Sequence, residues 1–137
     1  MAMMATAATA VADHGDGHGK HFDKCAKACS ACQRECASCF SHCVSLMAKG
    51  EKAHAATVRA CSDCAQVCAL TATLSASGSP MAFPVCEACA KVCDDCAAAC
   101  EKFKDDKQMV ACAKACRDCA KECREMAKHK PHPDDNK

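Results

Sequence analysis

The residues of this chain best suited to chemistry are its 18 cysteines. They fall into four groups, and within each group neighbouring cysteines are three or four positions apart. The groups are Cys25, Cys29, Cys32, Cys36, Cys39 and Cys43; Cys61, Cys64 and Cys68; Cys86, Cys89, Cys93, Cys96 and Cys100; and Cys112, Cys116, Cys119 and Cys123. One CxxC step is a weak signal, but overlapping CxxC and CxxxC steps in four groups indicate binding of soft metal ions by thiolates.

The charge of the expected sites favours Cu(I) as the metal. A thiol that binds Cu⁺ releases a proton. A buried row of one-to-one Cu(I)–thiolate units therefore stays neutral. A zinc tetrathiolate carries two negative charges, and no Lys or Arg continues the cysteine register to offset them. Thiolates also select Cu(I) because both are soft. We therefore expect multiple Cu(I) ions, roughly ten if each ion takes two thiolates and roughly twenty if each takes one bridging thiolate.

Two other functions remain open for the same cysteines. The thiols would cycle through disulfides and sulfenic acids in a redox or oxidant-scavenging protein. Alternatively, the chain would buffer zinc or another soft metal. An enzyme is not expected, because no single Cys is accompanied by an orienting carboxylate or an oxyanion-hole loop.

The elements that carry the cysteines must be helices. Spacings that alternate between three and four residues place side chains on one face of a helix and do not fit the two-residue period of a strand. Leu, Ile, Val and Phe together supply only 14 of 137 residues, about 10%, well below the ~20% of an ordinary core. Cysteine and alanine must therefore fill the interior.

We predict an all-α fold, an antiparallel up-down-up-down four-helix bundle with a Cys-lined core. The expected helices span about His21 to Met47, Lys52 to Leu74, Val85 to Phe103 and Lys107 to Lys128. Asp105 or Asp106 is the expected N-cap of the last helix. The domains would be a flexible N-terminal segment at 1–20, the copper-binding bundle at 21–128 and a polar tail at 129–137.

The segments CAKACSACQRECASCFSHC, RACSDCAQVC, CEACAKVCDDCAAAC and CAKACRDCAKEC resemble the bacterial copper storage proteins, a family of cysteine-rich four-helix bundles. The resemblance covers residues 21–128. It implies bulk storage of Cu(I) by the 18 inward cysteines, serving copper supply and detoxification. It also implies a tetramer, as in several members, and a copper chaperone or cuproenzyme as the recipient of the metal.

Extending the cysteine register predicts which residues close the two ends of the bundle. One end would hold Leu46, His54, Thr57, Phe103 and Met109, with Met47 adjacent; the other would hold His18, Phe22, Thr71, Ala82 and Met126. Since family members resemble one another in placing Met and His where copper enters, we expect Met47, His54 and Met109 to be copper ligands. The alternative is that Met only fills gaps in the packing. His42 stands beside the register and is expected to be exposed.

The sequence also restricts location and partners. Met1–Ala12 ends in an A-x-A pattern, so we expect an exported, periplasmic protein, with a cytoplasmic one as the alternative because no Arg-Arg pair is present. No run approaches the ~20 apolar residues of a membrane span. A net charge of +1 and 3% aromatic residues argue against nucleic acid as a partner. The His-bearing segments DHGDGHGKH and HKPHPDDNK are expected to be solvated ends, with weak metal capture as the alternative.

Overall fold

A computed structural model describes residues 16–131, which contain helices and no strand. The helices are α1 (Asp16–Ala48), the short 3-10 helix η1 (Lys52–His54), α2 (Ala55–Ala76), α3 (Ala82–Glu101) and α4 (Lys107–Lys128). The predicted all-α fold class is confirmed.

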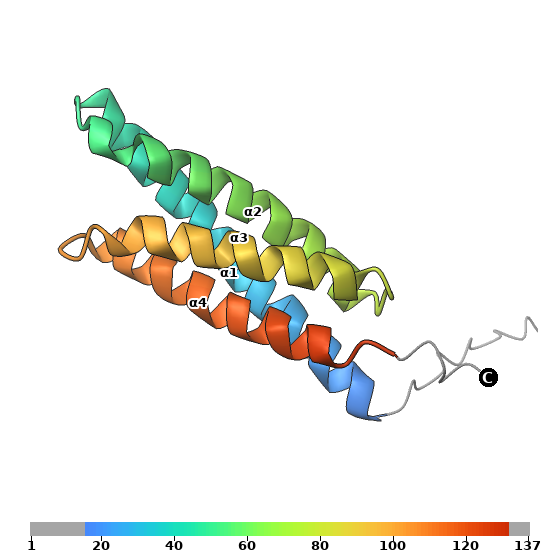
Figure 1. Ribbon diagram of the computed structural model, residues 1–137. Helices are drawn as coiled ribbons and strands as arrows, with labels where there is room; N and C mark the ends of the chain where they lie inside the picture. Colours follow the sequence, from blue (N-terminus) through green and yellow to red (C-terminus); the bar gives the residue numbers. More distant parts are fainter. Residues whose placement is uncertain (1–15, 132–137) are drawn as a thin grey trace, which may run out of the picture.

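The four long helices form an antiparallel bundle (Figure 1). Helices α1 and α3 each pack against both α2 and α4, so α1 and α3 lie diagonally across the core. The α1–α2 and α3–α4 turns lie at one end of the bundle, and the α2–α3 turn lies at the other with the start of α1 and the end of α4. This is the predicted up-down-up-down topology.

Local sequence explains where the helices stop. Gly50 and Gly78 have positive φ angles of 94° and 66°, a conformation that glycine adopts without a Cβ clash. Each follows a helix and leads into a 6→1 hydrogen bond, from Glu51 N to Leu46 O and from Ser79 N to Leu74 O, the C-terminal motif expected at such glycines. These turns reverse the chain within a few residues and so keep successive helices antiparallel.

Two helices begin earlier than the sequence predicted. Helix α1 starts at Asp16 and not at His21. Gly17 and Gly19 each cost the helix about 1 kcal/mol of stability, which is too little to end it. Helix α3 starts at Ala82 and not at Val85, because Pro84 falls in the first turn, where its missing N–H costs nothing. Helix α4 has the predicted bounds, Lys107–Lys128.

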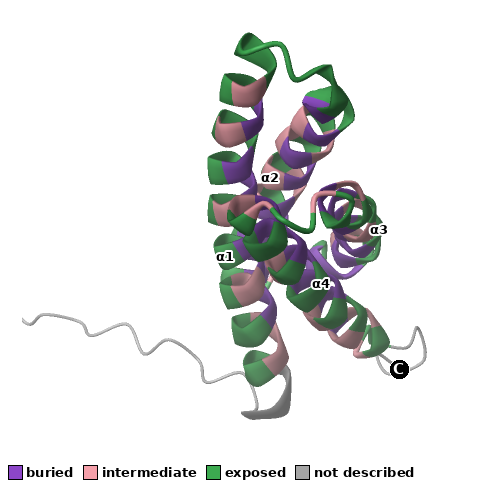
Figure 2. Ribbon diagram, turned by 90° about the vertical axis from the view of Figure 1, so that its left-hand side faces the viewer, coloured by how far each residue is buried: buried purple, intermediate pink, exposed green. Residues whose placement is uncertain are grey.

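All 18 cysteines lie in the core, and each is 0% exposed. Figure 2 shows the buried face of every helix turned toward the others. Buried alanines on α2, α3 and α4 fill the remaining space, namely Ala72, Ala82, Ala90, Ala97, Ala113 and Ala120. Thiols occupy the positions that leucine takes in an ordinary bundle, because a neutral thiol packs as a small hydrophobe.

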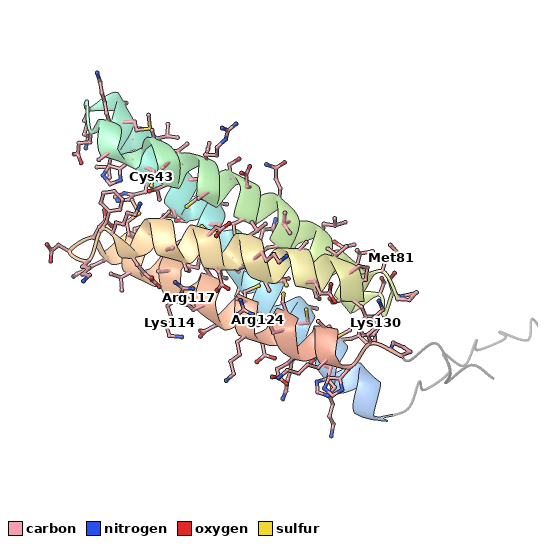
Figure 3. All side chains as sticks on the ribbon, viewed as in Figure 1. Cys43, Met81, Lys114, Arg117, Arg124 and Lys130 are labelled. Atoms are coloured by element: carbon pink, nitrogen blue, oxygen red, sulfur yellow. The ribbon has the colours of Figure 1, made fainter. Side chains whose placement is uncertain are left out.

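The charged residues lie outside this core. On the α3–α4 face, Arg117 makes a two-pronged ion pair with Glu101 at 2.9 and 3.0 Å and a third hydrogen bond to Asp94 at 2.9 Å. Arg124 pairs with the second oxygen of Asp94. In Figure 3 both arginines are labelled on α4. Between residues 16 and 131, no helix combines the length and hydropathy needed to cross a membrane.

Candidate metal centre

The cysteine sulfurs form one connected network along the bundle axis. Sγ–Sγ contacts of 3.3 to 4.0 Å join every cysteine except Cys39 and Cys43 into a single set. Cys39 and Cys43 lie 4.0 Å from each other. Cys39 also belongs with Cys61, Cys100 and Cys112 to a group whose sulfurs all lie within 4.8 Å of one another. We call this continuous array of 18 thiols the thiol column.

Sets of four thiols within the column have dimensions suited to metal ions. Metal–thiolate bonds are about 2.3 Å long, so two sulfurs on one ion lie up to roughly 4.6 Å apart. In each set the four sulfurs lie within 4.8 Å of one another; the sets include Cys29, Cys89, Cys119 and Cys123; Cys32, Cys36, Cys64 and Cys116; Cys32, Cys68, Cys93 and Cys119; and Cys36, Cys96, Cys112 and Cys116. Because the sets share members, the array is continuous and not divided into separate sites.

The interior around the thiols carries no compensating positive charge. Among the described residues, the buried polar side chains are His54, Thr57, Thr71 and Ser75, and no Lys or Arg is buried. A string of neutral Cu(I)–thiolate units can be accommodated here, whereas several tetrathiolate zinc sites with two negative charges each would be uncompensated. The structure therefore strengthens the preference for a monovalent soft ion.

Burial and hydrogen bonding act on the thiols in opposite directions. Burial raises the pKa of the Cys43 thiol, because the thiolate loses its hydration. Hydrogen bonding, first of all with Cys123, lowers the pKa of Cys25 despite burial. A metal ion that binds such thiols displaces their protons, so uptake is coupled to proton release at each site.

One end of the column meets a thioether. We call this end the mouth; it is formed by Leu46, His54, Thr57, Phe103 and Met109. The Met109 side chain is fully buried, and its Sδ accepts from Cys39 Sγ at 3.5 Å and from Cys43 Sγ at 3.7 Å. Figure 3 labels Cys43 near the α1–α2 turn. The thioether therefore continues the sulfur network by one more soft donor atom.

An imidazole with a free nitrogen lies at the same end. His54 is only 5% exposed, and its ring stacks on Phe103 with centroids 4.2 Å apart. Its Nε2 lies 3.4 Å from a carboxylate oxygen of Glu51, while Nδ1 is the one buried side-chain nitrogen or oxygen without a hydrogen-bond partner among the described residues. With the proton on Nε2 facing Glu51, the Nδ1 lone pair is free to bind a metal ion. Both rings line a groove of about 590 Å³.

A hydrogen-bond relay fixes Met109 at the mouth. Asp106 caps α4: its Oδ1 accepts from the backbone N–H of Gln108 at 2.9 Å and of Met109 at 3.2 Å. Its Oδ2 lies 2.7 Å from His42 Nε2 on α1. Burial alone would raise the pKa of Asp106, but the hydrogen bonds from His42 and Met109 N lower it below its usual range. His42, expected to be exposed, is half-buried and ties α1 to the start of α4.

The opposite end is closed by apolar groups, and we call it the blind end. It is formed by Phe22, Thr71, Ser75, Ala82, Phe83 and Met126. Phe22 and Phe83 meet edge to face across the bundle, with centroids 5.6 Å apart. Ser75 Oγ donates to Cys25 Sγ at 3.4 Å, and Met126 is 1% exposed. The hydroxyl and the rings complete the packing around the last thiols.

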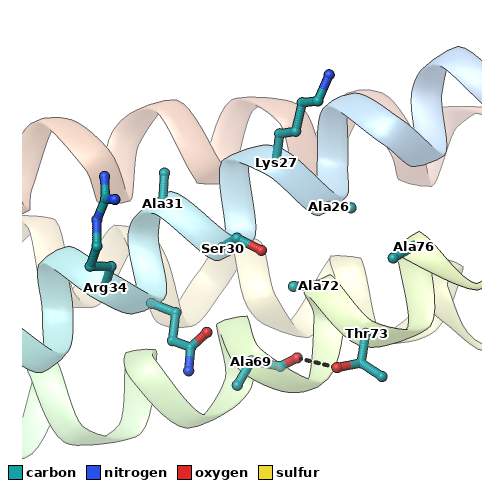
Figure 4. A pocket seen from close by; sticks show the side chains of 10 residues that line it. Ala26, Lys27, Ser30, Ala31, Arg34, Ala69, Ala72, Thr73 and Ala76 are labelled. Atoms are coloured by element: carbon teal, nitrogen blue, oxygen red, sulfur yellow. Dashed lines mark hydrogen bonds between the residues drawn. The ribbon is translucent and has the colours of Figure 1, made fainter.

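A separate groove of about 690 Å³ lies on the outer face between α1 and α2 (Figure 4). Small side chains line much of it, including Ala26, Ala31, Ala69, Ala72 and Ala76. No cysteine lines this groove, so it is distinct from the thiol column.

Comparison with known proteins identifies the family. The family model described as copper storage protein matches residues 2–128. The chain belongs to the copper storage protein family. Copper storage is therefore its function, and copper ions are its ligand. The family is one of storage proteins and not of enzymes.

Solved structures of copper storage proteins share the fold. The Cu(I)-bound copper storage protein BsCsp3, whose apo form is Csp3 from Bacillus subtilis, is 34% identical with a TM-score of 0.71, covering 78% of this chain and 98% of that chain. Ccsp from Streptomyces lividans, loaded with 10 copper equivalents, is 28% identical with a TM-score of 0.74, covering 88% and 93%. No curated protein matches the chain by sequence.

The prediction of export to the periplasm is wrong. A second structure from Streptomyces lividans, described as a cytosolic copper storage protein with five coppers, is 26% identical with a TM-score of 0.73, covering 83% of this chain and 98% of that chain. The A-x-A pattern misled because it arises easily by chance in a chain with 30 alanines among 137 residues. Residues 1–12 lie outside the described residues.

The structure groups two of the three predicted ligands at the mouth of this copper storage protein. Met109 and His54 are buried there, one against thiols and the other with a free nitrogen. Met47 is 37% exposed and lies one residue beyond Leu46, which holds the register position. Sequence reasoning missed Ser75, although Thr71 and Ser75 continue the three-four spacing of Cys61, Cys64 and Cys68.

Proposed function

We propose that this copper storage protein holds roughly ten to twenty Cu(I) ions on its 18 cysteine thiolates and loads them through the mouth. The observation that carries the proposal is the thiol column: all thiols are buried, they touch in one network, and no buried Lys or Arg accompanies them in the described residues. The Streptomyces lividans structure loaded with 10 copper equivalents supports a capacity of this size. The chain would act as a store and not as a catalyst.

The path of an incoming ion follows the soft donors in order. His54 Nδ1 has no hydrogen-bond partner and its ring lines the groove, so it would take the ion first. Met109 Sδ follows, in contact with Cys39 and Cys43. From there each thiol has another within 4.8 Å, so the ion exchanges one sulfur ligand for the next without leaving the bundle. Met47, exposed on α1, would act at most on the surface beside the mouth.

Anaerobic titration of the reduced protein with Cu(I) against a competing chelator tests the capacity. We expect saturation at roughly ten to twenty ions per chain, with loss of thiol reactivity in proportion to the copper bound. Saturation at one or two ions would contradict bulk storage. A variant with Cys36, Cys64 and Cys116 replaced by serine removes thiols from the centre of the column. It should bind fewer ions while far-UV circular dichroism remains helical.

Two further measurements separate the alternative functions. Zinc should saturate at fewer ions per chain than Cu(I), at about four where each tetrathiolate site uses four separate thiols of the 18. The second measurement follows the loss of titratable thiols in air. A loss that is faster than copper uptake under nitrogen, and that a reductant reverses, would favour a redox role.

Assembly and delivery complete the proposal. The alanine-lined groove between α1 and α2 would allow close approach of another helix, which suits a tetramer of bundles. Light scattering of the copper-free protein should then give four times the 14.3 kDa chain mass. The recipient, a copper chaperone or cuproenzyme, would approach the mouth. Lys102 and Lys104 line the same groove as His54, so alanine substitutions at these two positions should slow transfer without changing capacity.

A further inference from the structure

Two histidines from the two ends of the described chain meet outside the blind end. His21 lies near the start of α1, and His129 is the residue that caps the end of α4. Their rings stack with centroids 3.6 Å apart and planes inclined by 25°. They are 108 positions apart in the sequence, so the bundle fold alone brings them together.

The separation of the rings suits a shared metal ion. Metal–imidazole bonds are about 2.0–2.1 Å long, so two nitrogens on one ion lie roughly 3 Å apart. Rings with centroids 3.6 Å apart are close enough to share one ion once they turn out of the stacked arrangement so that one nitrogen of each points at the same position. Both rings are half-buried, which limits the freedom that binding would have to remove.

A carboxylate lies close to the same pair. Glu125 precedes His129 by one helical turn and is half-buried. A hydrogen bond from Lys128 lowers its pKa, and the charges of His129 and His21 lower it further. Lys128 Nζ contacts only Oε1, at 2.8 Å, so the second carboxylate oxygen is left for another partner.

These donors differ in kind from those of the thiol column. Imidazole and carboxylate favour divalent ions such as Zn(II), Ni(II) and Cu(II), whereas the thiols favour Cu(I). Phe22 follows His21, and Met126 precedes His129 by three residues; both belong to the blind end that closes the column. The histidine pair therefore lies outside the thiol store, at the end away from the mouth.

We propose that His21, His129 and Glu125 form a surface site for one divalent ion, separate from the Cu(I) store and bridging α1 to α4. Water supplies the remaining ligands. A bound ion holds the start of α1 against the end of α4, where no covalent or ionic link joins these residues otherwise in the described range.

The test uses the full chain loaded with Cu(I), so that the thiols are occupied, and its copper content is measured first so that failed storage is seen separately. Ni(II) is then titrated anaerobically by calorimetry. We expect one Ni(II) per chain and a rise in the midpoint of thermal unfolding. His129→Ala and His21→Ala should each weaken binding by about tenfold or more and abolish the rise. Glu125→Gln should weaken binding less.

His132→Ala is the matched control, because it removes a histidine three positions after His129 in the sequence that the proposed site does not use. It should bind Ni(II) as the wild type does. Full binding by the His21→Ala and His129→Ala variants, with or without loss in His132→Ala, would overturn the assignment. Circular dichroism of each variant shows whether the helices are intact, and the copper content should stay unchanged in all four.

Discussion

At the mouth, the last thiols of the column touch a thioether and lie near an imidazole with a free nitrogen, whereas at the blind end they meet two phenyl rings and a hydroxyl. Both ends complete the packing of the column. In the described range, only the mouth joins its thioether to the thiols by hydrogen bonds and adds an imidazole nitrogen without a partner. The same structural need, closing a bundle, is thus met in one place by soft donor atoms in contact with the column and in the other mainly by phenyl rings and a hydroxyl.

Two buried methionines on α4 make the comparison direct. Met109 and Met126 are 0% and 1% exposed and stand near opposite ends of the same helix. Met109 Sδ accepts hydrogen bonds from two thiols, whereas the Met126 sulfur accepts none among the described residues. Methionine is therefore a donor in one setting and a filler in the other, and the surroundings decide which.

The largest expected effect is a difference in how much the packing at each end contributes to the stability of the bundle. Phe83→Ala removes a buried ring that packs against Phe22, and it should lower the free energy of unfolding of the copper-free protein by about 3 kcal/mol. Phe103→Ala, at the half-exposed stack on His54, should lower it by clearly less. Urea unfolding under reducing conditions measures both. Equal losses would show that the mouth is closed by packing as tightly as the blind end.

The next effect is a difference in how a methionine at each end influences the rate of copper uptake. Met109→Leu keeps the volume but removes the thioether next to Cys39 and Cys43, so Cu(I) uptake should slow by about tenfold, equivalent to ~1.4 kcal/mol of barrier. Met126→Leu is the matched control at the blind end and should leave the rate unchanged. Stopped-flow mixing with a coloured Cu(I)–chelator complex follows both. Similar slowing in the two variants would mean that copper enters at either end.

The smallest effect concerns the relay that holds Met109. Asp106→Ala removes the cap of α4 and should cost about 1 kcal/mol of stability at neutral pH, while Asp106→Asn, which can still cap, should cost less. Since the folded state lowers the pKa of Asp106, its contribution is complete above the ordinary aspartate pKa of about 3.9 and is lost as the pH falls through the lower folded value.

The pH dependence of thermal unfolding in acid checks this sign. The wild type should lose more stability than Asp106→Asn as the pH falls below about 4, so the two curves should converge. A difference that widens in acid would contradict the role of the ionised cap.

Much of the site followed from spacing alone. The alternation of three and four residues placed all 18 cysteines inside, and its extension placed Met109, Thr71 and Met126 at the ends, where they are buried. The same register explains why Met47 is exposed, since Leu46 holds the inward position. Periodicity works here because every helix presents the same narrow face to the core.

The spacing does not predict contacts between residues that are distant in the sequence and lie at the edges of that face. His42 and Asp106 are 64 positions apart, and neither lies in the register, so no local pattern pairs them. The stack of His21 on His129 depends on how far the start of α1 and the end of α4 run beside each other. Such pairs depend on the axial alignment of helices, which propensity and periodicity leave free.

The unbroken sulfur network has a consequence for the order in which copper is exchanged. If copper passes only through the mouth, as proposed, ions held deeper would leave only through positions occupied by ions nearer the opening. The ions that entered last would then leave first. Protein loaded first with ⁶³Cu and then with ⁶⁵Cu should release ⁶⁵Cu first to a chelator, so the molecule would keep a short record of the sequence in which its contents arrived.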